Sequence, residues 1–306
     1  MKITNKFGIP QFLFDRLSRD YYGGKRGPDR FSATEILNPP MYVWLNRRHH
    51  DEIVVDVLGI LYSIQGSLMH LLMDQIDDNA LTEERLSHKY NGVVLSGGFD
   101  RFDESLWDYK YTSVWSHIKK TNFPKWEVQL NIYNYLLRQA GFDPVDLNII
   151  EMFRDWSYAK YKINVYGDLL PIEIVKMEKY PDNITEDLIH NRIDYLLKFR
   201  YVPDEELPEC PMEDRWQDPD KFAVMKEGGK RASITGYDRK ELEEWIAKQK
   251  DPSLYNIELR TFEPRRCGEK IITRNGAVAD IGYCRVKQWC PWWQSHKHEF
   301  GESSED

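Results

Sequence analysis

Residues 97–110, with the letters GGFD and then LWDYK, constrain the fold more than any other part of the sequence. Successive side chains of a strand point to opposite faces, so Asp108 and Lys110 share one face and Tyr109 lies on the other. The Gly-Gly pair and a polar turn predict a hairpin that brings Asp100 beside them. Two carboxylates and an ammonium group then suit a divalent metal such as Mg²⁺ and a phosphate substrate. A surface hairpin with ordinary charges is the alternative.

Two further segments predict helices with a polar face. In the apolar run from Glu52 to Ile76, small and polar residues recur at spacings of three and four, namely Ser63, Gly66, Ser67, His70 and Asp74. This spacing predicts one helical face, and the position of His70 on it favours a cleft over a structural core histidine. The second helix is expected over Trp126 to Ala140, where Gln129 and Tyr133 lie one turn apart.

The order of these residues along the chain resembles the PD-(D/E)XK nuclease superfamily, and within it the RecB-like exonuclease branch. That branch includes AddB-type nucleases, CRISPR-adaptation nucleases and phage-encoded relatives. The matching residues are His70, Asp100, Asp108, Lys110, Gln129 and Tyr133. The resemblance implies an α/β fold, with a mixed central sheet flanked by helices, and metal-dependent hydrolysis of DNA phosphodiesters.

The resemblance also implies a role for each matching residue. One or two Mg²⁺ or Mn²⁺ ions would be held by His70, Asp100, Asp108 and the backbone carbonyl of Tyr109. Lys110 would orient the attacking water or neutralise developing charge, and Gln129 and Tyr133 would position the DNA strand or the surroundings of Lys110.

Four cysteines lie late in the chain, at Cys210, Cys267, Cys284 and Cys290. A cytosolic chain keeps its thiols reduced, so this grouping favours a metal over disulfides. Several RecB-like nucleases carry an iron–sulfur cluster on one distant cysteine and three near the C-terminus, and the resemblance implies a [4Fe–4S] cluster here. The sequence departs from that pattern because sixteen residues, instead of two or three, separate Cys267 from Cys284.

An Asn-Gly pair at residues 275–276 explains the longer spacing, because it is a strong signal for a two-residue hairpin turn. Counting outward pairs Arg274 with Ala277, Thr273 with Val278, Ile271 with Asp280 and Cys267 with Cys284. Opposed residues have Cβ atoms about 4.5–5.5 Å apart, so two thiolates placed in this way can share a metal. Zn²⁺ competes with the iron–sulfur cluster, since four thiolates suit both, and four free buried cysteines are the remaining alternative.

The rest of the chain supports an α/β core with a C-terminal addition. Ser32 followed by Glu35 predicts a helix start that Asn38-Pro39-Pro40 ends. Strands are expected over Leu147–Arg154 and Leu170–Met177, and an amphipathic helix over Thr185–Arg200. We therefore expect an N-terminal helical segment over 1–50 and a nuclease core over 51–203. Residues 204–306 would form an acidic linker and a cysteine-clamped extension on a restriction-endonuclease-like core.

The net charge of -8 argues only mildly against a nucleic-acid partner, because charge is unevenly distributed. Residues 204–220 carry eight carboxylates and one arginine, which predicts a solvated linker, whereas residues 260–298 carry eight Lys or Arg against three acids. No apolar stretch reaches the roughly 18 residues of a membrane span, and the first residues lack a signal peptide. We expect a soluble cytoplasmic protein, in the host cytoplasm if it is phage-encoded.

The expected partner is DNA, single-stranded or with a free end, in DNA processing or recombination, with a possible recombination or helicase protein beside it. Trp292, Trp293 and the segment Lys221 to Arg231 are candidates for holding single-stranded DNA by stacking and charge. Three alternatives stay open. These are a catalytically silent DNA-binding subunit, an RNA-directed nuclease, and a protein whose cysteine-bound cluster is its main function.

Overall fold

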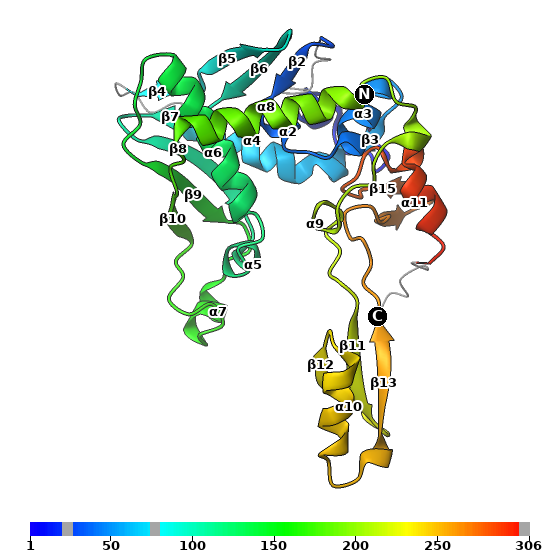
Figure 1. Cartoon of the computed structure of the whole chain (residues 1–306). Coiled ribbons are helices and arrows are strands. Elements are labelled where there is room, and N and C mark those ends of the chain that lie inside the picture. Colours follow the sequence, from blue (N-terminus) through cyan, green and yellow to red (C-terminus); the bar gives the residue numbers. More distant parts are fainter. Residues whose placement is uncertain (20–26, 74–79, 300–306) are drawn as a thin grey trace.

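The computed structural model describes residues 1–19, 27–73 and 80–299 and has a mixed α/β architecture (Figure 1). Within these ranges its largest sheet has five strands, in the order β10-β9-β8-β7-β4. Their bounds are β4 Leu81–Thr82, β7 Arg101–Phe102, β8 Leu106–Thr112, β9 Leu147–Phe153 and β10 Ile172–Met177. Strands β8 and β9 are parallel and the other neighbours are antiparallel, so the sheet is mixed.

A helical crossover joins the two parallel strands, as parallel pairing requires. It consists of α5 (Val114–Ile118) and α6 (Phe123–Gln139). The predicted helix over 126–140 is therefore confirmed, and so are the strands predicted over 147–154 and 170–177. The helix predicted over 185–200 is α8 (Asp182–Lys198). All four predictions are correct to within a few residues at each end.

A second sheet, three-stranded among the described residues, has the order β2-β6-β5. Its strands are β2 (Arg30–Ser32), β5 (Arg85–Tyr90) and β6 (Val93–Gly98). Asn91 and Gly92 join β5 to β6 with positive φ at both positions, as a type I′ hairpin turn requires. After β6 the chain crosses directly into β7 of the first sheet, so Asp100 lies where one sheet passes into the other.

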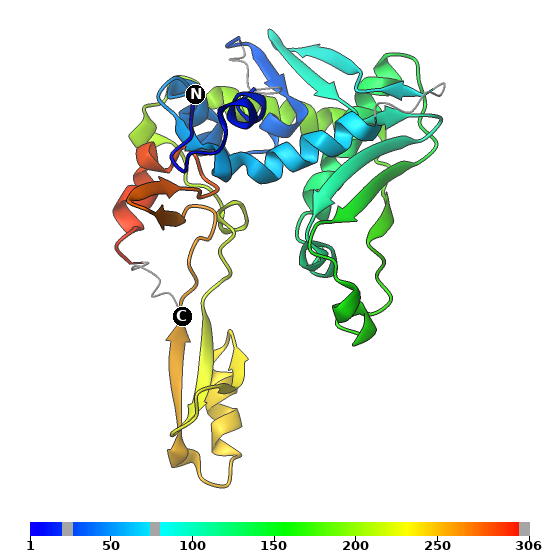
Figure 2. The same ribbon diagram turned by 180° about the vertical axis from the view of Figure 1, so that it is seen from behind.

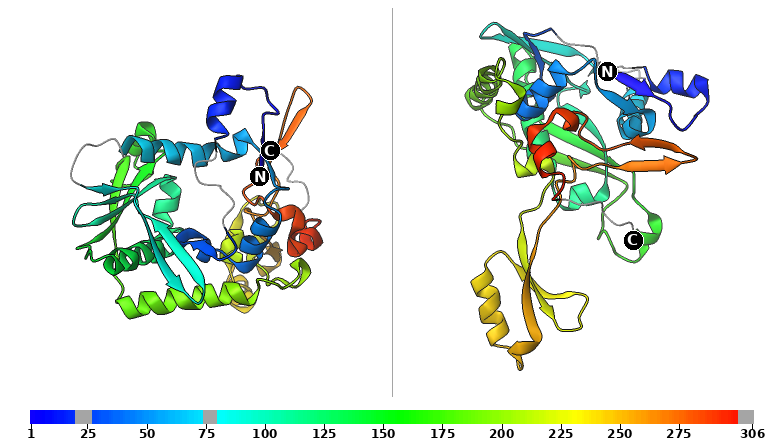
Figure 3. Two further views of the ribbon diagram at one scale, coloured as in Figure 1. Left: turned by 90° about the horizontal axis from the view of Figure 1, so that it is seen from above. Right: turned by 90° about the vertical axis from the view of Figure 1, so that its right-hand side faces the viewer.

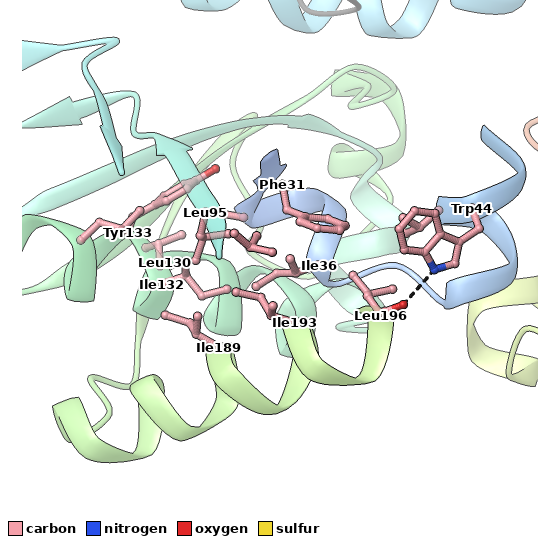
Figure 4. Close-up of a cluster of buried hydrophobic side chains, with 14 of the residues drawn as sticks. Phe31, Ile36, Trp44, Leu95, Leu130, Ile132, Tyr133, Ile189, Ile193 and Leu196 are labelled. Atoms are coloured by element: carbon pink, nitrogen blue, oxygen red, sulfur yellow. Dashed lines mark hydrogen bonds between the residues drawn. The ribbon is translucent and has the colours of Figure 1, made fainter. Parts of the chain in front are cut away.

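The core lies between these sheets and helices α2 (Ala33–Ile36), α3 (Pro40–Arg48), α6 and α8 (Figure 4). Ser32 caps α2 in a capping box with Glu35, which confirms the predicted helix start. From α8, Ile189, Ile193 and Leu196 point into the core. The Trp44 indole donates a hydrogen bond to the carbonyl of Leu196 at 2.9 Å, which joins α3 to α8.

Gly97 sets how closely β6 approaches α6. A Cβ placed on Gly97 would lie 2.8 Å from side-chain atoms of both Leu136 and Tyr133, which are buried on α6. Only a residue without a side chain permits this approach. The close contact brings Tyr133 toward the strand end that carries Asp100.

The N-terminal part of the chain belongs to the same body. Strand β1 (Lys2–Thr4) pairs with β3 (Val54–Asp56), and helix α1 (Gln11–Leu17) follows β1. The expected helical segment over 1–50 thus contains strands, and its residues Phe31 and Trp44 are part of the main core.

The helix predicted from Glu52 is wrong over its first turns. The β-branched Val54 and Val55 pair with β1, and Asp56 caps a short 3₁₀ helix, η1 (Val57–Ile60). Helix α4 (Leu61–Met73) follows, and it runs on the side of the body opposite α8 (Figures 1 and 2). Although α4 is apolar, none of the helices in the described ranges combines the length and apolarity needed to cross a membrane.

A separate module, the arm (residues 221–260), projects from the body (Figures 1 and 3). It consists of β11 (Lys221–Lys226), β12 (Ala232–Gly236), α10 (Arg239–Ala247), η3 (Pro252–Leu254) and β13 (Tyr255–Arg260). Strand β11 pairs with both β12 and β13. Ala223 and Val224 of β11 and Leu242 of α10 are buried and do not belong to the main core.

The remaining C-terminal elements pack on the body. Before the arm come η2 (Asp204–Glu206) and α9 (Met212–Arg215), and after it come the hairpin β14 (Ile271–Arg274) and β15 (Ala277–Asp280), η4 (Lys287–Trp289) and α11 (Pro291–His296). The Trp289 ring stacks on His49 at 4.4 Å between centroids. Arg266 lies over the Tyr42 ring at 4.8 Å. The C-terminal segment is thereby held against α3 and the residue that follows it.

We expect Gly97→Ala to lower the free energy of unfolding by about 1–3 kcal/mol, because the added methyl group overpacks the contact with Tyr133 and Leu136. Chemical denaturation measures the change. Gly66→Ala is the matched control, since a Cβ at Gly66 meets nothing within 4 Å. Alanine in that helix should raise stability by roughly 0.5–1 kcal/mol. Equal stability of Gly97→Ala and the parent protein would contradict the close-approach assignment.

Candidate functional site

A cleft of about 820 Å³ collects the residues that the sequence singled out. Its lining includes six of the predicted site residues, His70, Asp100, Asp108, Lys110, Gln129 and Tyr133. The small polar face predicted on α4 also lines it, through Ser63, Gly66 and Ser67. Asp74, predicted on the same face, lies outside the described residues.

Strand β8 places Asp108 and Lys110 on one face, as alternation predicts, and their side chains form an ion pair. Asp108 is only 2% exposed. Burial raises the pKa of Asp108 to about 6, a rise that Lys110 opposes and the nearby carboxylate of Asp100 increases. Asp108 therefore lies between a carboxylate that repels it and a lysine that attracts it.

Asp100 is held in place by two contacts. Its Oδ2 accepts a hydrogen bond from the backbone N–H of Tyr109 at 2.6 Å. Its Oδ1 lies 3.3 Å from Nδ1 of His70 on α4. The Tyr109 ring is buried and lies 6.0 Å from the His70 ring. The hairpin therefore brings Asp100 beside the Asp-Tyr-Lys strand, as predicted.

Glu83 belongs to the same group, although sequence analysis did not identify it. Its Oε1 lies 3.1 Å from Nδ1 of His70. One ligand atom from each of His70, Glu83 and Asp100 lies within 4.8 Å of the others. Burial lowers the pKa of His70, but hydrogen bonds to Asp100 and Glu83 outweigh that effect and raise it to about 10.

A signal for Glu83 was present in the sequence. Asn91-Gly92 is a second hairpin turn of the same type as the one at residues 275–276. Counting outward from it pairs Arg85 with Gly98, the observed register, and places Glu83 opposite Asp100. The N–H of Glu83 indeed donates to the Asp100 carbonyl at 3.1 Å. Arg85, also missed, is the first residue of β5 and lines the cleft.

Gln129 and Tyr133 meet on α6, as their spacing predicts. Gln129 Nε2 donates a hydrogen bond to the Tyr133 hydroxyl at 2.7 Å. Burial, together with the charge of Asp108, raises the pKa of Tyr133 well above its ordinary value. Tyr133 thus keeps its proton and is able to donate a hydrogen bond into the cleft.

The four cysteines form a second group, away from the cleft carboxylates. Cys267, Cys284 and Cys290 are buried in the main core, and Cys210 packs against them. Burial raises the pKa of Cys210 to about 12, and the other three thiols add to the rise. Burial also raises the pKa of Cys267 to about 12, with Cys284 as the next contributor.

The hairpin that precedes Cys284 has the predicted register. Asn275 and Gly276 both have positive φ, and Thr273 pairs with Val278 and Ile271 with Asp280. The ladder ends there, and Cys267 and Cys284 are therefore not a strand pair. The segments on either side of the hairpin nevertheless stay adjacent, since the Ile281 N–H donates a hydrogen bond to the Lys270 carbonyl at 2.9 Å.

Two surface predictions need correction. Trp293 is buried in the core, because α11 packs its ring inward, and it cannot be a stacking platform for DNA. Trp292 is covered by the Arg215 guanidinium at 3.9 Å and stacks on His296. Within the acidic linker, Asp204 is not merely solvated, because it pairs with Arg48 and His49 of the body.

No family model and no curated protein matches this chain. Among solved structures it is similar to one described as the crystal structure of SSO0001. The TM-score is 0.45 at 16% identity, and the overlap covers 63% of this chain and 87% of that one. A similarity of this size assigns no function, so the function has to be inferred from the residues of this chain.

The raised pKa of His70 makes the stability of the metal-free protein depend on pH. Its contribution is fully present below the unfolded pKa of about 6.5 and is lost as pH rises through about 10. In EDTA, we expect the free energy of unfolding to fall between pH 6.5 and 10 more steeply in the parent than in His70→Gln, by on the order of 1–3 kcal/mol.

Denaturant titrations across this pH range measure the difference. His298→Gln, at an exposed position near the C-terminus, is the control and should keep the slope of the parent. If His70→Gln shows the same slope as both, the imidazole is not held in its charged form by Asp100 and Glu83.

Proposed function

We propose that this chain is a metal-dependent nuclease of the PD-(D/E)XK type that hydrolyses DNA phosphodiesters. The observation that carries the proposal is the Asp108–Lys110 pair on β8, with Asp100 hydrogen-bonded to the same strand at the wall of a cleft. A mixed sheet with a helical crossover between its parallel strands supports a restriction-endonuclease-like core. The proposed substrate is DNA, single-stranded or with a free end.

The chemistry of the cleft fits Mg²⁺ or Mn²⁺. Carboxylate oxygens of Asp100 and Glu83 converge with the imidazole of His70, and the buried Asp108 carboxylate lies on the neighbouring strand. Asp100, Asp108 and His70 would hold the ion, with Glu83 as an added donor. The Tyr109 carbonyl stays a prediction. When bound, the cation supplies Lewis-acid stabilisation of phosphate charge and lowers the pKa of a water nucleophile.

The other residues of the cleft would act on the substrate directly. Lys110 places a positive charge beside Asp108, where it can orient the attacking water or offset charge on the phosphate. The Tyr133 hydroxyl keeps its proton and, held by Gln129, can donate to a phosphate oxygen. Arg85 lines the same cleft and is suited to contact the DNA backbone.

We further propose that the four cysteines bind a [4Fe–4S] cluster, with Zn²⁺ as the alternative. The four cysteines pack in one cluster, and the other three thiols lie near enough to Cys210 to raise its pKa. Arg215 and Arg266 lie near enough to lower the pKa of Cys267.

We expect Asp100→Ala and Asp108→Ala to abolish metal-dependent cleavage while the protein stays folded. Each variant removes a ligand, so the loss should exceed the roughly 10–100-fold that removal of an outer-shell partner costs. The measurement is cleavage of end-labelled single-stranded DNA, double-stranded DNA and RNA in Mg²⁺ or Mn²⁺. Asp168→Ala, at an exposed position, is the control and should cleave at the parent rate.

Turnover near the parent rate in both variants would refute the site. Binding of DNA by the parent without cleavage under any metal condition would support a catalytically silent subunit instead. Preferred cleavage of RNA would assign the alternative substrate.

Replacing any one of the four cysteines with Ser should release bound iron or zinc and destabilise the C-terminal segment, because metal binding contributes directly to folding. Metal content per chain and an anaerobic absorption spectrum, compared between the parent and the four variants, measure this. Ser295→Ala, on the exposed side of α11, is the control. A parent protein prepared anaerobically with neither iron nor zinc would remove the cofactor from the proposal.

A further inference from the structure

A third group of metal-ligating side chains lies where α8 meets β5. Glu186 and His190 are one turn apart on α8, and His88 comes from β5. One ligand atom from each lies within 4.8 Å of the other two. None of the three lines the cleft. Strand alternation places His88 on the face of β5 opposite to Arg85, so this group is separate from the proposed nuclease site.

A surrounding layer of rings and hydrogen bonds holds the three side chains in place. Glu186 Oε1 accepts a hydrogen bond from the Tyr135 hydroxyl at 3.0 Å, and the Tyr135 ring packs edge-on to His88. Tyr90 stacks on His190 with centroids 3.6 Å apart, and its hydroxyl donates to Asp194 at 2.7 Å. Such outer partners are typical of metal sites, where they fix the orientation of the ligands.

One nitrogen atom of this group lacks a hydrogen bond. Nε2 of His190 is shielded from solvent and has no hydrogen-bond partner among the described residues. The His88 and His190 rings stack with their centroids 5.9 Å apart. Neutral imidazoles with unused nitrogen atoms are the form that binds a metal.

We propose that His88, Glu186 and His190 bind a divalent transition-metal ion, for which Zn²⁺ is the best match, with water in the fourth position. Two imidazoles and one carboxylate are a common zinc ligand set, whereas Mg²⁺ and Ca²⁺ prefer oxygen. Tetrahedral ligands on zinc lie roughly 3.4 Å apart, so small side-chain rotations bring the three atoms into range. The ion would tie α8 to β5.

The test compares Glu186→Gln with the parent. Glutamine keeps the volume and the acceptor for Tyr135 but removes the anionic ligand. The matched control is Asp187→Asn, which removes the same charge from the next, exposed position. All three proteins contain the cysteines and the cleft, so differences in zinc content isolate this site. After dialysis against Zn²⁺, we expect Glu186→Gln to hold one equivalent less than the parent and Asp187→Asn to match the parent.

Thermal unfolding gives a second measurement. Zn²⁺ should raise the melting temperature of the parent and Asp187→Asn more than that of Glu186→Gln, since an ion that binds only the native state stabilises it by mass action. Co²⁺ substitution adds a spectroscopic check. The parent should show visible d–d bands of an imidazole–carboxylate site that the variant lacks, distinct from the near-ultraviolet charge transfer of thiolate sites.

His88→Gln repeats the comparison from the other element, in case Glu186→Gln is too unstable to measure. Equal zinc content and equal stabilisation by zinc in the parent, Glu186→Gln and His88→Gln would overturn the proposal and leave a metal-free cluster of packed rings. That result would not bear on the nuclease proposal, because DNA cleavage depends on the cleft residues.

Discussion

The close contact between β6 and α6 at Gly97 is the constraint on which the rest of the structure depends. It allows α6 to lie directly on the strand that leads to Asp100, so Tyr133 and Gln129 reach the carboxylates of the cleft. The same helix presents Tyr135 to Glu186 of α8. One helix thus supports two polar groups on different faces, and its position is fixed by a residue that has no side chain.

Sequence patterns predicted those parts of the structure that follow from local geometry. The alternation of side chains along a strand predicted that Asp108 and Lys110 share a face. The spacing of one helical turn predicted that Gln129 lies beside Tyr133. The Asn275-Gly276 pair predicted the register of the hairpin. The predictions failed where contacts with segments far away in the sequence determine the local structure. Val54 belongs to a strand because β1 is available to pair with it, and Trp293 is buried because α11 packs on the core. Neither of these contacts can be inferred from the residues that adjoin Val54 or Trp293 in the sequence.

The cysteine group and the cleft share a boundary, although they were predicted as separate features. Arg285 directly follows Cys284 and lines the cleft, and Arg48 lines it while pairing with Asp204. His49 beside it stacks on Trp289, which directly precedes Cys290. The residues that order the cysteine segment are therefore neighbours of those that shape one end of the cleft. A change in the packing of the cysteines would therefore first alter the positions of Arg48 and Arg285 at that end of the cleft.

The arm is inserted between Cys210 and Cys267, and its two ends run side by side. Lys221 pairs with Arg260, and Arg266 N–H donates to the Arg215 carbonyl at 3.0 Å. Bringing two distant thiols together costs entropy that grows with the logarithm of the intervening flexible length. Because the two ends of the arm are paired with each other, the flexible length that separates the two thiols in the folded chain is only that of the connections on either side of the arm. The arm is therefore free to diverge in length and sequence while the geometry at its base stays constant.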